Sequence, residues 1–200
     1  VVVYASGKNK YELSEGGTDH IHTDFKLSSS KSETLYLRNN LGKLDNTMQV
    51  PANLKTDMVY CFHNNKYGYL PHSTRNADIV DVYHGVYKMN FDLLDVDNKR
   101  GFYTSSTQVT ASYNDPDESN VVLWYSKNSK LPIDYDIKTG KEIVNGQLYS
   151  GPIQVDNICT IIFQAVKKVG DKKYICKGYT THTYLFPEKV KEQSTQLPPG

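Results

Sequence analysis

The sequence has few cysteines, and their number limits what can hold the fold together. Among its 200 residues stand three, Cys61, Cys159 and Cys176. A small secreted domain that depends on disulfides carries more of them, usually an even number, so no disulfide framework is expected. A turn at residues 169–171 would place Cys176 nearer to Gln164 than to Cys159, which argues against a bridge. We expect three buried thiols.

Long apolar runs and an excess of one charge are also missing. No run approaches the roughly 20 apolar residues of a transmembrane helix, and residues 1–4 are too short and uncharged for a signal peptide. The net charge is +1, so no global field attracts nucleic acid or an anionic membrane. We expect no nucleic-acid partner and no membrane span. Because residues 1–5 resemble the middle of a strand, we also expect sequence upstream of Val1.

Signatures of catalysis are lacking. The chain contains no G-x-S-x-G or cysteine-protease pattern, no G-x-x-x-x-G-K and no G-x-G-x-x-G. Nucleophilic catalysis and phosphate binding therefore have no visible motif. We expect no enzyme, no catalytic residue and no cofactor.

What the sequence does contain is a series of short β-branched and aromatic runs between Gly, Asn, Asp and Pro clusters. Helical spacing of apolar residues is almost absent, so the pattern predicts an all-β protein. Residues 39–42 (N-N-L-G) predict a hairpin turn between two strands. The expected strands are residues 1–5, 24–27, 34–38, 44–50, 59–62, 86–89, 108–113, 121–125, 153–155, 160–168, 172–179 and 181–186.

The turn-like and charged stretches between about residues 72 and 100 predict a domain boundary, which we place near residue 88. The expected organisation is a first module over residues 1–88, a second over 89–187 and a linker or tail over 188–200. The tail has too little apolar surface to fold alone.

The first half resembles the second part of bacterial lamin-tail domains. The matching segments are residues 5–8 (A-S-G-K), 22–29 (H-T-D-F-K-L-S-S), 33–37 (E-T-L-Y-L) and 41–46 (L-G-K-L-D-N). In that family they follow one another in this order, ending in a hairpin with an E-T-[LV]-x-L strand. The resemblance implies an immunoglobulin-like β-sandwich whose N-terminal strands are lacking from this chain.

The second half resembles the chitobiase/β-hexosaminidase C-terminal-type module. The matching segments are residues 101–104 (G-F-Y-T), 109–112 (V-T-A-S), 123–126 (L-W-Y-S), 148–153 (L-Y-S-G-P-I) and 181–184 (T-H-T-Y). A lamin-tail domain followed by this module is similar to the region upstream of the kinase-like domain in secreted bacterial CotH-type proteins. The resemblances together imply two small immunoglobulin-like β-sandwich modules in tandem, secreted or at the bacterial cell surface.

Metal sites are a weaker alternative. His20 and His22 would share one face of a strand, which is the spacing of some zinc sites. Residues 95–98 and 114–118 are acidic, but neither has the ligand spacing of an EF-hand loop. We expect a structural His22 and solvated turns, and no metal.

Tyrosine is the outlier of the composition, with 16 residues beside one Trp and 6 Phe. Most tyrosines suit half-buried sheet positions. The alternative is an exposed aromatic platform for sugar rings, and its first candidates for glycan contact are Trp124, Tyr125, Tyr67 and Tyr69. Trp124 is expected to face the core, with Leu123 and Tyr125 on the opposite face.

Two functions follow. The first is a pair of non-catalytic extracellular β modules that space, present or dock neighbouring domains of the same polypeptide. The second is a carbohydrate-binding module of a polysaccharide-targeting secreted protein. Outside the polypeptide, the expected partner is a polysaccharide or a cell-surface protein. For the packing, we expect the side chains of Leu35, Leu37, Ile161, Phe163 and Ala165 to be buried. We expect Thr34 and Tyr36 on the opposite face of their strand.

Overall fold

The computed structural model describes residues 2–12, 20–54, 58–73, 79, 82–127 and 130–190. The regular elements of this part are strands, apart from a 3₁₀ helix, η1 (Phe91–Leu93), and a short helix, α1 (Pro187–Val190). The protein is therefore all-β, as the strand pattern predicted. Its chain divides into two compact units, Val1–Tyr60 and Cys61–Gly200.

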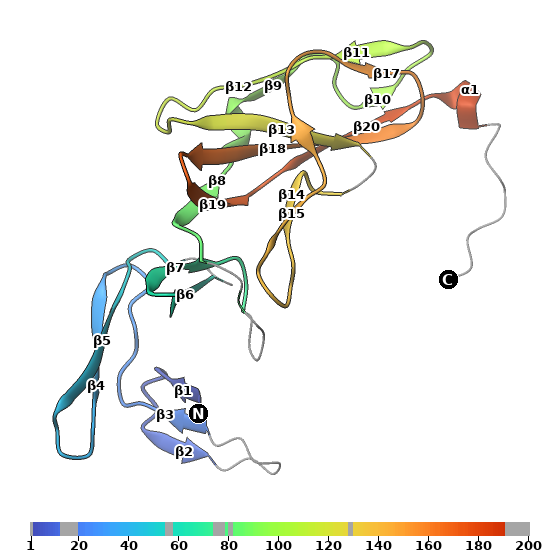
Figure 1. The fold of residues 1–200 in the computed structure, drawn as a ribbon. Coiled ribbons are helices and arrows are strands. Elements are labelled where there is room, and N and C mark those ends of the chain that lie inside the picture. Colours follow the sequence, from blue (N-terminus) through green and yellow to red (C-terminus); the bar gives the residue numbers. More distant parts are fainter. Residues whose placement is uncertain are drawn as a thin grey trace. The chain divides into compact units, whose positions relative to one another are not determined.

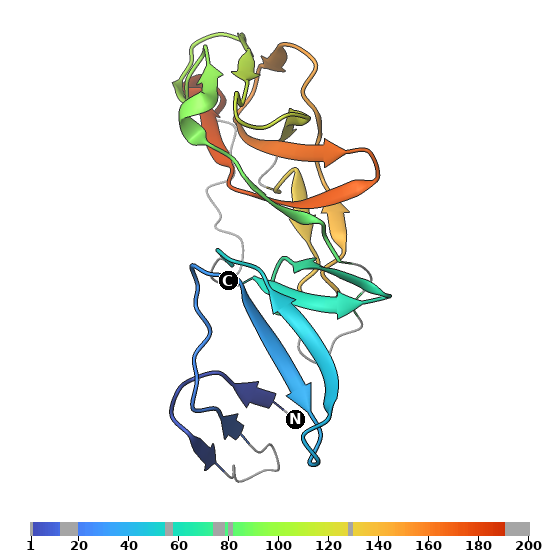
Figure 2. The ribbon, with the colours of Figure 1, turned by 90° about the vertical axis from the view of Figure 1, so that its left-hand side faces the viewer.

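The first unit contains a small sheet and a long hairpin. In the sheet, β3 (His20–His22) pairs parallel with β1 (Val2–Tyr4) and antiparallel with β2 (Lys10–Glu12). The hairpin joins β4 (Glu33–Arg38) to β5 (Leu44–Val50) in antiparallel register (Figure 2). The predicted pairing of these two strands is confirmed.

The turn of the β4–β5 hairpin is stabilised by the Asn and Gly residues from which it was predicted. The side-chain oxygen of Asn39 accepts hydrogen bonds from the backbone N–H groups of Leu41 and Lys43, each at 3.0 Å. Gly42 lies at φ +75°, in the left-handed region that glycine enters without steric cost. The turn is therefore fixed by local chemistry.

Burial on this hairpin differs from the prediction. Leu35 is half-buried, but Leu37 is 61% exposed, much like Tyr36 at 62%. Within Val1–Tyr60, Met58 is the one described residue that is buried. A two-stranded hairpin has no second layer of its own to cover it, and the two faces of β4–β5 are mostly exposed. The predicted burial of Leu37 is wrong for this reason.

The second unit is built on a seven-stranded sheet (Figure 1). Its main path runs β10-β20-β18-β13-β16, and β19 extends it by pairing with β18 and with β8. The pairs of β18 with β13 and β20 are antiparallel, whereas β19 pairs parallel with β8. The bounds are β8 (Gly85–Lys88), β10 (Gly101–Phe102), β13 (Val121–Lys127), β16 (Gln147–Leu148), β18 (Cys159–Val169), β19 (Lys172–Lys177) and β20 (Thr180–Leu185).

Four two-stranded pairs complete the described strands. They are β6 (Val59–His63) with β7 (Lys66–Leu70), β9 (Leu94–Val96) with β12 (Ala111–Tyr113), β11 (Thr107–Val109) with β17 (Ile153–Val155), and β14 (Ile133–Tyr135) with β15 (Glu142–Val144).

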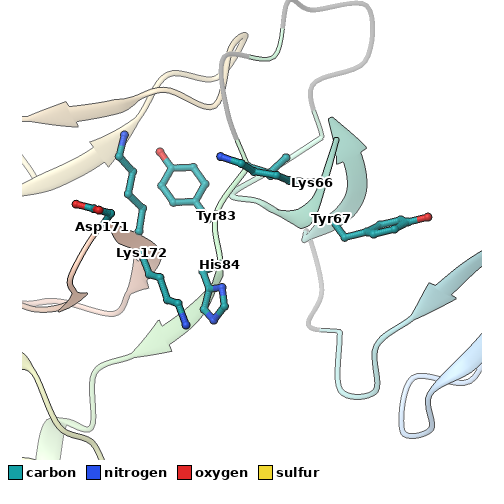
Figure 3. Close-up of a pocket in the computed structure, with 8 residues that line it drawn as sticks. Lys66, Tyr67, Tyr83, His84, Asp171 and Lys172 are labelled. Atoms are coloured by element: carbon teal, nitrogen blue, oxygen red, sulfur yellow. The ribbon is translucent and has the colours of Figure 1, made fainter. Parts of the chain in front are cut away.

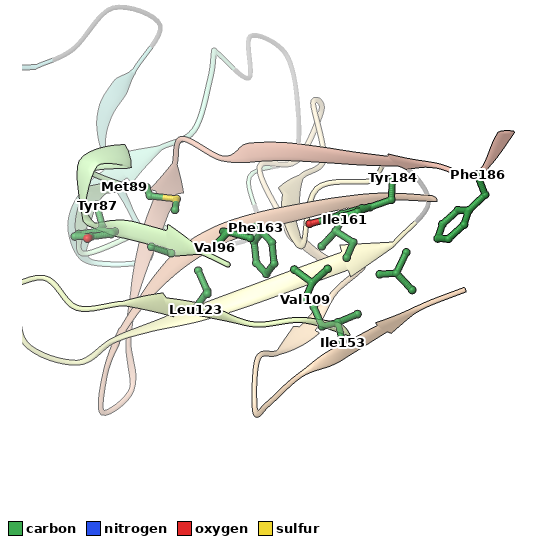
Figure 4. Packing of buried hydrophobic residues seen from close by; sticks show 12 residues of the cluster. Tyr87, Met89, Val96, Val109, Leu123, Ile153, Ile161, Phe163, Tyr184 and Phe186 are labelled. Atoms are coloured by element: carbon green, nitrogen blue, oxygen red, sulfur yellow. The ribbon is translucent and has the colours of Figure 1, made fainter. Parts of the chain in front are cut away.

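The main core lies between the large sheet and the pairs β9–β12 and β11–β17. It contains Ile161, Phe163 and Ala165 of β18, each 0% exposed, together with residues from both pairs. Figure 4 shows Phe163 in the middle of this cluster. The predicted burial of these three side chains is confirmed.

A second cluster covers the other face of β18. Val166 of β18 packs there with Ile133 of β14 and Cys176 of β19, and Trp124 lies against them. Because β18 is covered on both sides, residues 161–166 are all buried. This explains the run I-I-F-Q-A-V, which is apolar except for Gln164 and is typical of a strand buried on both faces.

Two predicted strands take a different form. At residues 24–27 no strand forms, and Lys26 makes a single bridge to Ser6. The run at residues 108–113 is divided at Thr110, because β11 pairs with β17 while β12 pairs with β9. The second run has the composition of a strand, but its hydrogen-bond partner changes at Thr110.

The chain divides into its two compact units after Tyr60, whereas the sequence predicted a junction near residue 88. The strand β8, which that junction would separate from the second half, is hydrogen-bonded to β19 from Gly85 to Lys88. Tyr87 of β8 also belongs to the main core. Because of this long-range pairing, residues 61–88 belong to the second unit. The predicted tail at residues 188–200 lies outside the described residues from 191 onward.

Candidate functional site

The β6–β7 hairpin carries an exposed pair of aromatic rings. Its turn residues Asn64 and Asn65 lie at φ +48° and +58°, as a two-residue hairpin turn requires. Phe62 lies beside Tyr67, with ring centroids 4.8 Å apart. Phe62 is 56% exposed and Tyr67 46% exposed. Tyr69, two positions along the strand, is on the same face as Tyr67 and is half-buried.

Main-chain hydrogen bonds tie this hairpin to the large sheet. Tyr69 and Tyr83 exchange two of them, with N to O distances of 2.8 and 2.9 Å. The next residue, His84, donates its N–H to the carbonyl of Lys173 at 2.8 Å. Gly68 permits the close approach, since a Cβ there would lie 2.7 Å from the carbonyl oxygen of Tyr83. The hairpin is therefore held next to the turn between β18 and β19.

A pocket of about 270 Å³ opens where these segments meet (Figure 3). Figure 3 shows the Lys66 side chain directed toward Tyr83, whereas the Tyr67 ring points away. The lining contains one histidine, His84, and four charged residues, Lys66, Asp171, Lys172 and Lys173. The three lysines form no ion pair within the described part of the chain. The pocket is therefore cationic.

A second pocket, of about 400 Å³, adjoins the first and shares three residues of the turn with it. It adds Lys167 and Lys168, with Glu142 as a carboxylate. The ammonium group of Lys167 pairs with Glu118, and that of Lys168 lies 4.7 Å from the ring centroid of Trp124. The ammonium groups of Lys167 and Lys168 are therefore already in contact with other side chains of the protein.

The four residues predicted for glycan contact do not form one surface. Trp124 and Tyr125 are consecutive on β13, and Trp124 packs on the second cluster while Tyr125 packs on the main core. Leu123 and Tyr125 share the face opposite Trp124, as predicted, but theirs is the face that packs on the main core, while the predicted core residue Trp124 packs on the smaller second cluster. Tyr67 and Tyr69 lie on β7. Only this second pair belongs to the aromatic hairpin.

Sequence reasoning missed the neighbours that complete the site. Phe62 stands five residues before Tyr67, and the Asn64-Asn65 turn that brings them together is readable as a hairpin signal. The lysines near the β18–β19 turn belong to the stretch K-K-V-G-D-K-K, from which only a turn is predicted. That Lys66 joins them depends on pairing between segments about 100 positions apart, for which no local signal exists.

Several tyrosine hydroxyls of the second unit bind the main chain of distant segments. The hydroxyl of Tyr184 donates to the carbonyl of Asn98 at 2.8 Å, and that of Tyr149 accepts from the N–H of Ala111 at 2.9 Å. Tyr135 accepts from the N–H of Cys176 at 2.6 Å. Burial raises the pKa of Tyr135 far above its usual range. The hydroxyl of Tyr135 is therefore a neutral hydrogen-bonding group.

The residues considered for metal binding are engaged in the fold. The ring of His22 stacks on Tyr4 with centroids 5.0 Å apart, and its Nδ1 lies 2.9 Å from the hydroxyl oxygen of Ser6. Asp97 accepts a hydrogen bond from the N–H of Thr110 at 2.8 Å. Within the described ranges, three or more His, Cys, Asp or Glu residues nowhere gather as a metal site would require.

The acidic stretch at residues 114–118 is tied to the sheet. Asp115 accepts from the hydroxyl of Tyr87 at 2.6 Å, which in turn lies 2.6 Å from the hydroxyl of Tyr113. Burial and these hydrogen bonds raise the pKa of Tyr87 far above its usual range. The stretch therefore serves as a hydrogen-bonded turn.

The three cysteines are free thiols. Cys176 is buried, while Cys61 and Cys159 are half-buried. Burial raises the pKa of each, that of Cys176 to about 11, so all three favour the unreactive thiol form. Gln164 donates to the carbonyl of Cys176 at 3.2 Å, which confirms that Cys176 lies next to Gln164.

A third pocket contains a histidine with an unusual environment. His182 lines it together with Lys99 and Arg100. Its Nδ1 is buried and has no hydrogen-bond partner in the described part of the protein. Burial lowers the pKa of His182, and the nearby Arg100 and Lys99 lower it further. The imidazole is therefore held in its neutral form, and Asp95 is the one carboxylate in the lining.

A comparison with known proteins finds no matching family model, no matching curated protein and no matching solved structure. None of the helices in the described ranges has the length and apolar character needed to cross a bilayer.

Proposed function

We propose that the chain is a non-catalytic extracellular β assembly that spaces, presents or docks a neighbouring domain of a secreted bacterial CotH-type or related surface protein. The observation that carries this proposal is a set of hydrogen bonds between tyrosine hydroxyls and the main chain. Tyr135, Tyr149 and Tyr184 each bind the main chain of another segment through the hydroxyl. Such cross-links favour a rigid scaffold, which suits a unit that positions another domain.

The experiment acts on the parent polypeptide. Residues 61–190 are replaced by a Gly/Ser linker that spans the same distance, and surface exposure of the neighbouring domain is measured by antibody labelling of intact cells. We expect labelling to fall at unchanged total protein, because a flexible coil cannot fix the position of that domain. Unchanged labelling would contradict the proposal.

Carbohydrate binding is the second candidate, and the exposed Phe62–Tyr67 pair supports it. Aromatic rings at a protein surface offer flat apolar faces, and full burial of a Phe side chain stabilises by about 1.5–3 kcal/mol, of which a sugar covering one face gains a part. Phe62 and Tyr67 are neighbours with exposed rings on one hairpin. This arrangement suits stacking against sugar rings.

Replacing Phe62 and Tyr67 together by alanine should weaken retention on a bound polysaccharide about tenfold to hundredfold. Retention is measured by affinity electrophoresis over a panel of soluble polysaccharides. The matched control is the double variant Phe102→Ala with Tyr179→Ala, which removes one Phe and one Tyr that are 76% and 49% exposed. The control should bind like the wild type. Equal loss in both variants, or no retention of the wild type on any glycan, argues against this candidate.

A further inference from the structure

Positive charge is concentrated at the turn between β18 and β19. The two adjoining pockets are lined by five lysines and by two carboxylates, Asp171 and Glu142. The whole chain carries a net charge of only +1. Within the described residues, the lysines of these pockets that lack both an ion pair and a ring contact are Lys66, Lys172 and Lys173.

The main chain places these lysines together before any ligand arrives. The segment at Tyr83 and His84 is hydrogen-bonded to β7 on one side and to Lys173 on the other. The ring of His84 packs edge-on against Tyr174 with centroids 5.5 Å apart. Lys66 on β7 thereby lines the same pocket as Lys172 (Figure 3) and Lys173 of β19. A preformed site of this kind loses less conformational entropy on binding.

The hairpin that carries Lys66 also carries the aromatic pair, with Phe62 on β6 and Tyr67 on β7. Tyr67 follows Lys66 directly, and both belong to the pocket lining. A cation and an aromatic ring on consecutive strand positions point to opposite faces, so the edge of the hairpin offers a charge on one side and a stacking ring on the other. A polymer chain that crosses this edge can place anionic groups on the lysine side and flat rings on the side of Phe62 and Tyr67.

On the basis of the carbohydrate-binding candidate, we propose that this surface binds an acidic polysaccharide. Its carboxylates are held by Lys66, Lys172 and Lys173, and its sugar rings contact Phe62 and Tyr67. Ammonium groups pair with carboxylates as flexible point charges, so the site recognises charge spacing along the polymer. The binding weakens with salt, since exposed charges are screened over about 10 Å at 0.1 M ionic strength.

The test uses three probes with the full chain. Polygalacturonate has rings and charges, its fully methyl-esterified form keeps the rings without the charges, and polyphosphate has charges without rings. We expect polygalacturonate to bind at least about tenfold more tightly than either of the others. The double variant Lys172→Gln with Lys173→Gln should bind polygalacturonate about tenfold more weakly. The control Lys31→Gln with Lys43→Gln, which changes the net charge equally in the first unit, should leave binding unchanged.

Each contrary result has its own meaning. Equal binding of the esterified polymer overturns the charge-recognition proposal but leaves the carbohydrate-binding candidate standing. Failure of every probe and every neutral glycan removes both. Polyphosphate binding as tight as that of polygalacturonate, or equal losses in the two lysine double variants, would show attraction by charge alone and would overturn the proposal.

Discussion

Replacing Phe163 with alanine should destabilise the second unit by about 3–5 kcal/mol, the range typical of a buried phenylalanine truncated to alanine. Phe163 is 0% exposed and belongs to the main core. Its ring contacts Tyr149 and His182 edge-on, with centroids 6.2 and 5.8 Å apart. Because these two partners come from separate segments, the cavity left behind cannot be closed by moving one of them.

The measurement is urea unfolding followed by tryptophan fluorescence. Trp124 is the only tryptophan of the chain and lies on β13, which is paired with β18, so its signal follows the second unit. The control is Phe102→Ala, at a side chain that is 76% exposed and should change stability by less than about 0.5 kcal/mol. A loss below about 1 kcal/mol for Phe163→Ala would show that the core assignment is wrong.

Phe163 also illustrates what the sequence could predict. Its burial followed from a long β-branched and aromatic run, and the structure places that run in the strand β18. The hairpin at Gly42 was predictable because its turn residues act locally. Both the burial of Phe163 and the hairpin turn were predicted from patterns within a few consecutive residues, and both predictions are confirmed.

Features that depend on distant pairing were not predictable. The exposure of Leu37 follows from the lack of a covering layer within its own unit, which no property of the β4 sequence specifies. The strand β7 contains Gly68, which disfavours a strand by propensity, yet glycine is needed there for the approach of Tyr83. Within the candidate site, the sequence indicated Tyr67 and Tyr69. The lysines near them could not be predicted, because their positions depend on the pairing of β7 with residues 82–84.

The buried amide of Gln164 carries the second large prediction. Gln164 is 2% exposed, its side-chain oxygen accepts from the N–H of Ile133 at 2.8 Å, and its amide nitrogen donates to the carbonyl of Cys176. It thereby links β18 to β14 and β19. Gln164→Leu should cost about 2–4 kcal/mol, because each buried backbone group left without a partner costs about 1–3 kcal/mol, partly offset by the apolar side chain.

A second variant separates hydrogen bonding from packing. Gln164→Glu keeps the shape, but the ionised carboxylate cannot donate to the carbonyl of Cys176, so burial should raise its pKa above that of the unfolded chain. The stability of this variant is then greatest below the unfolded pKa and is lost as the pH rises through the folded pKa. Relative to wild type at each pH, Gln164→Glu should therefore be less stable at pH 7 than at pH 5, by urea unfolding with Trp124 fluorescence. A pH-independent difference, together with a loss near zero for Gln164→Leu, would mean that the amide fills space without bridging the three strands.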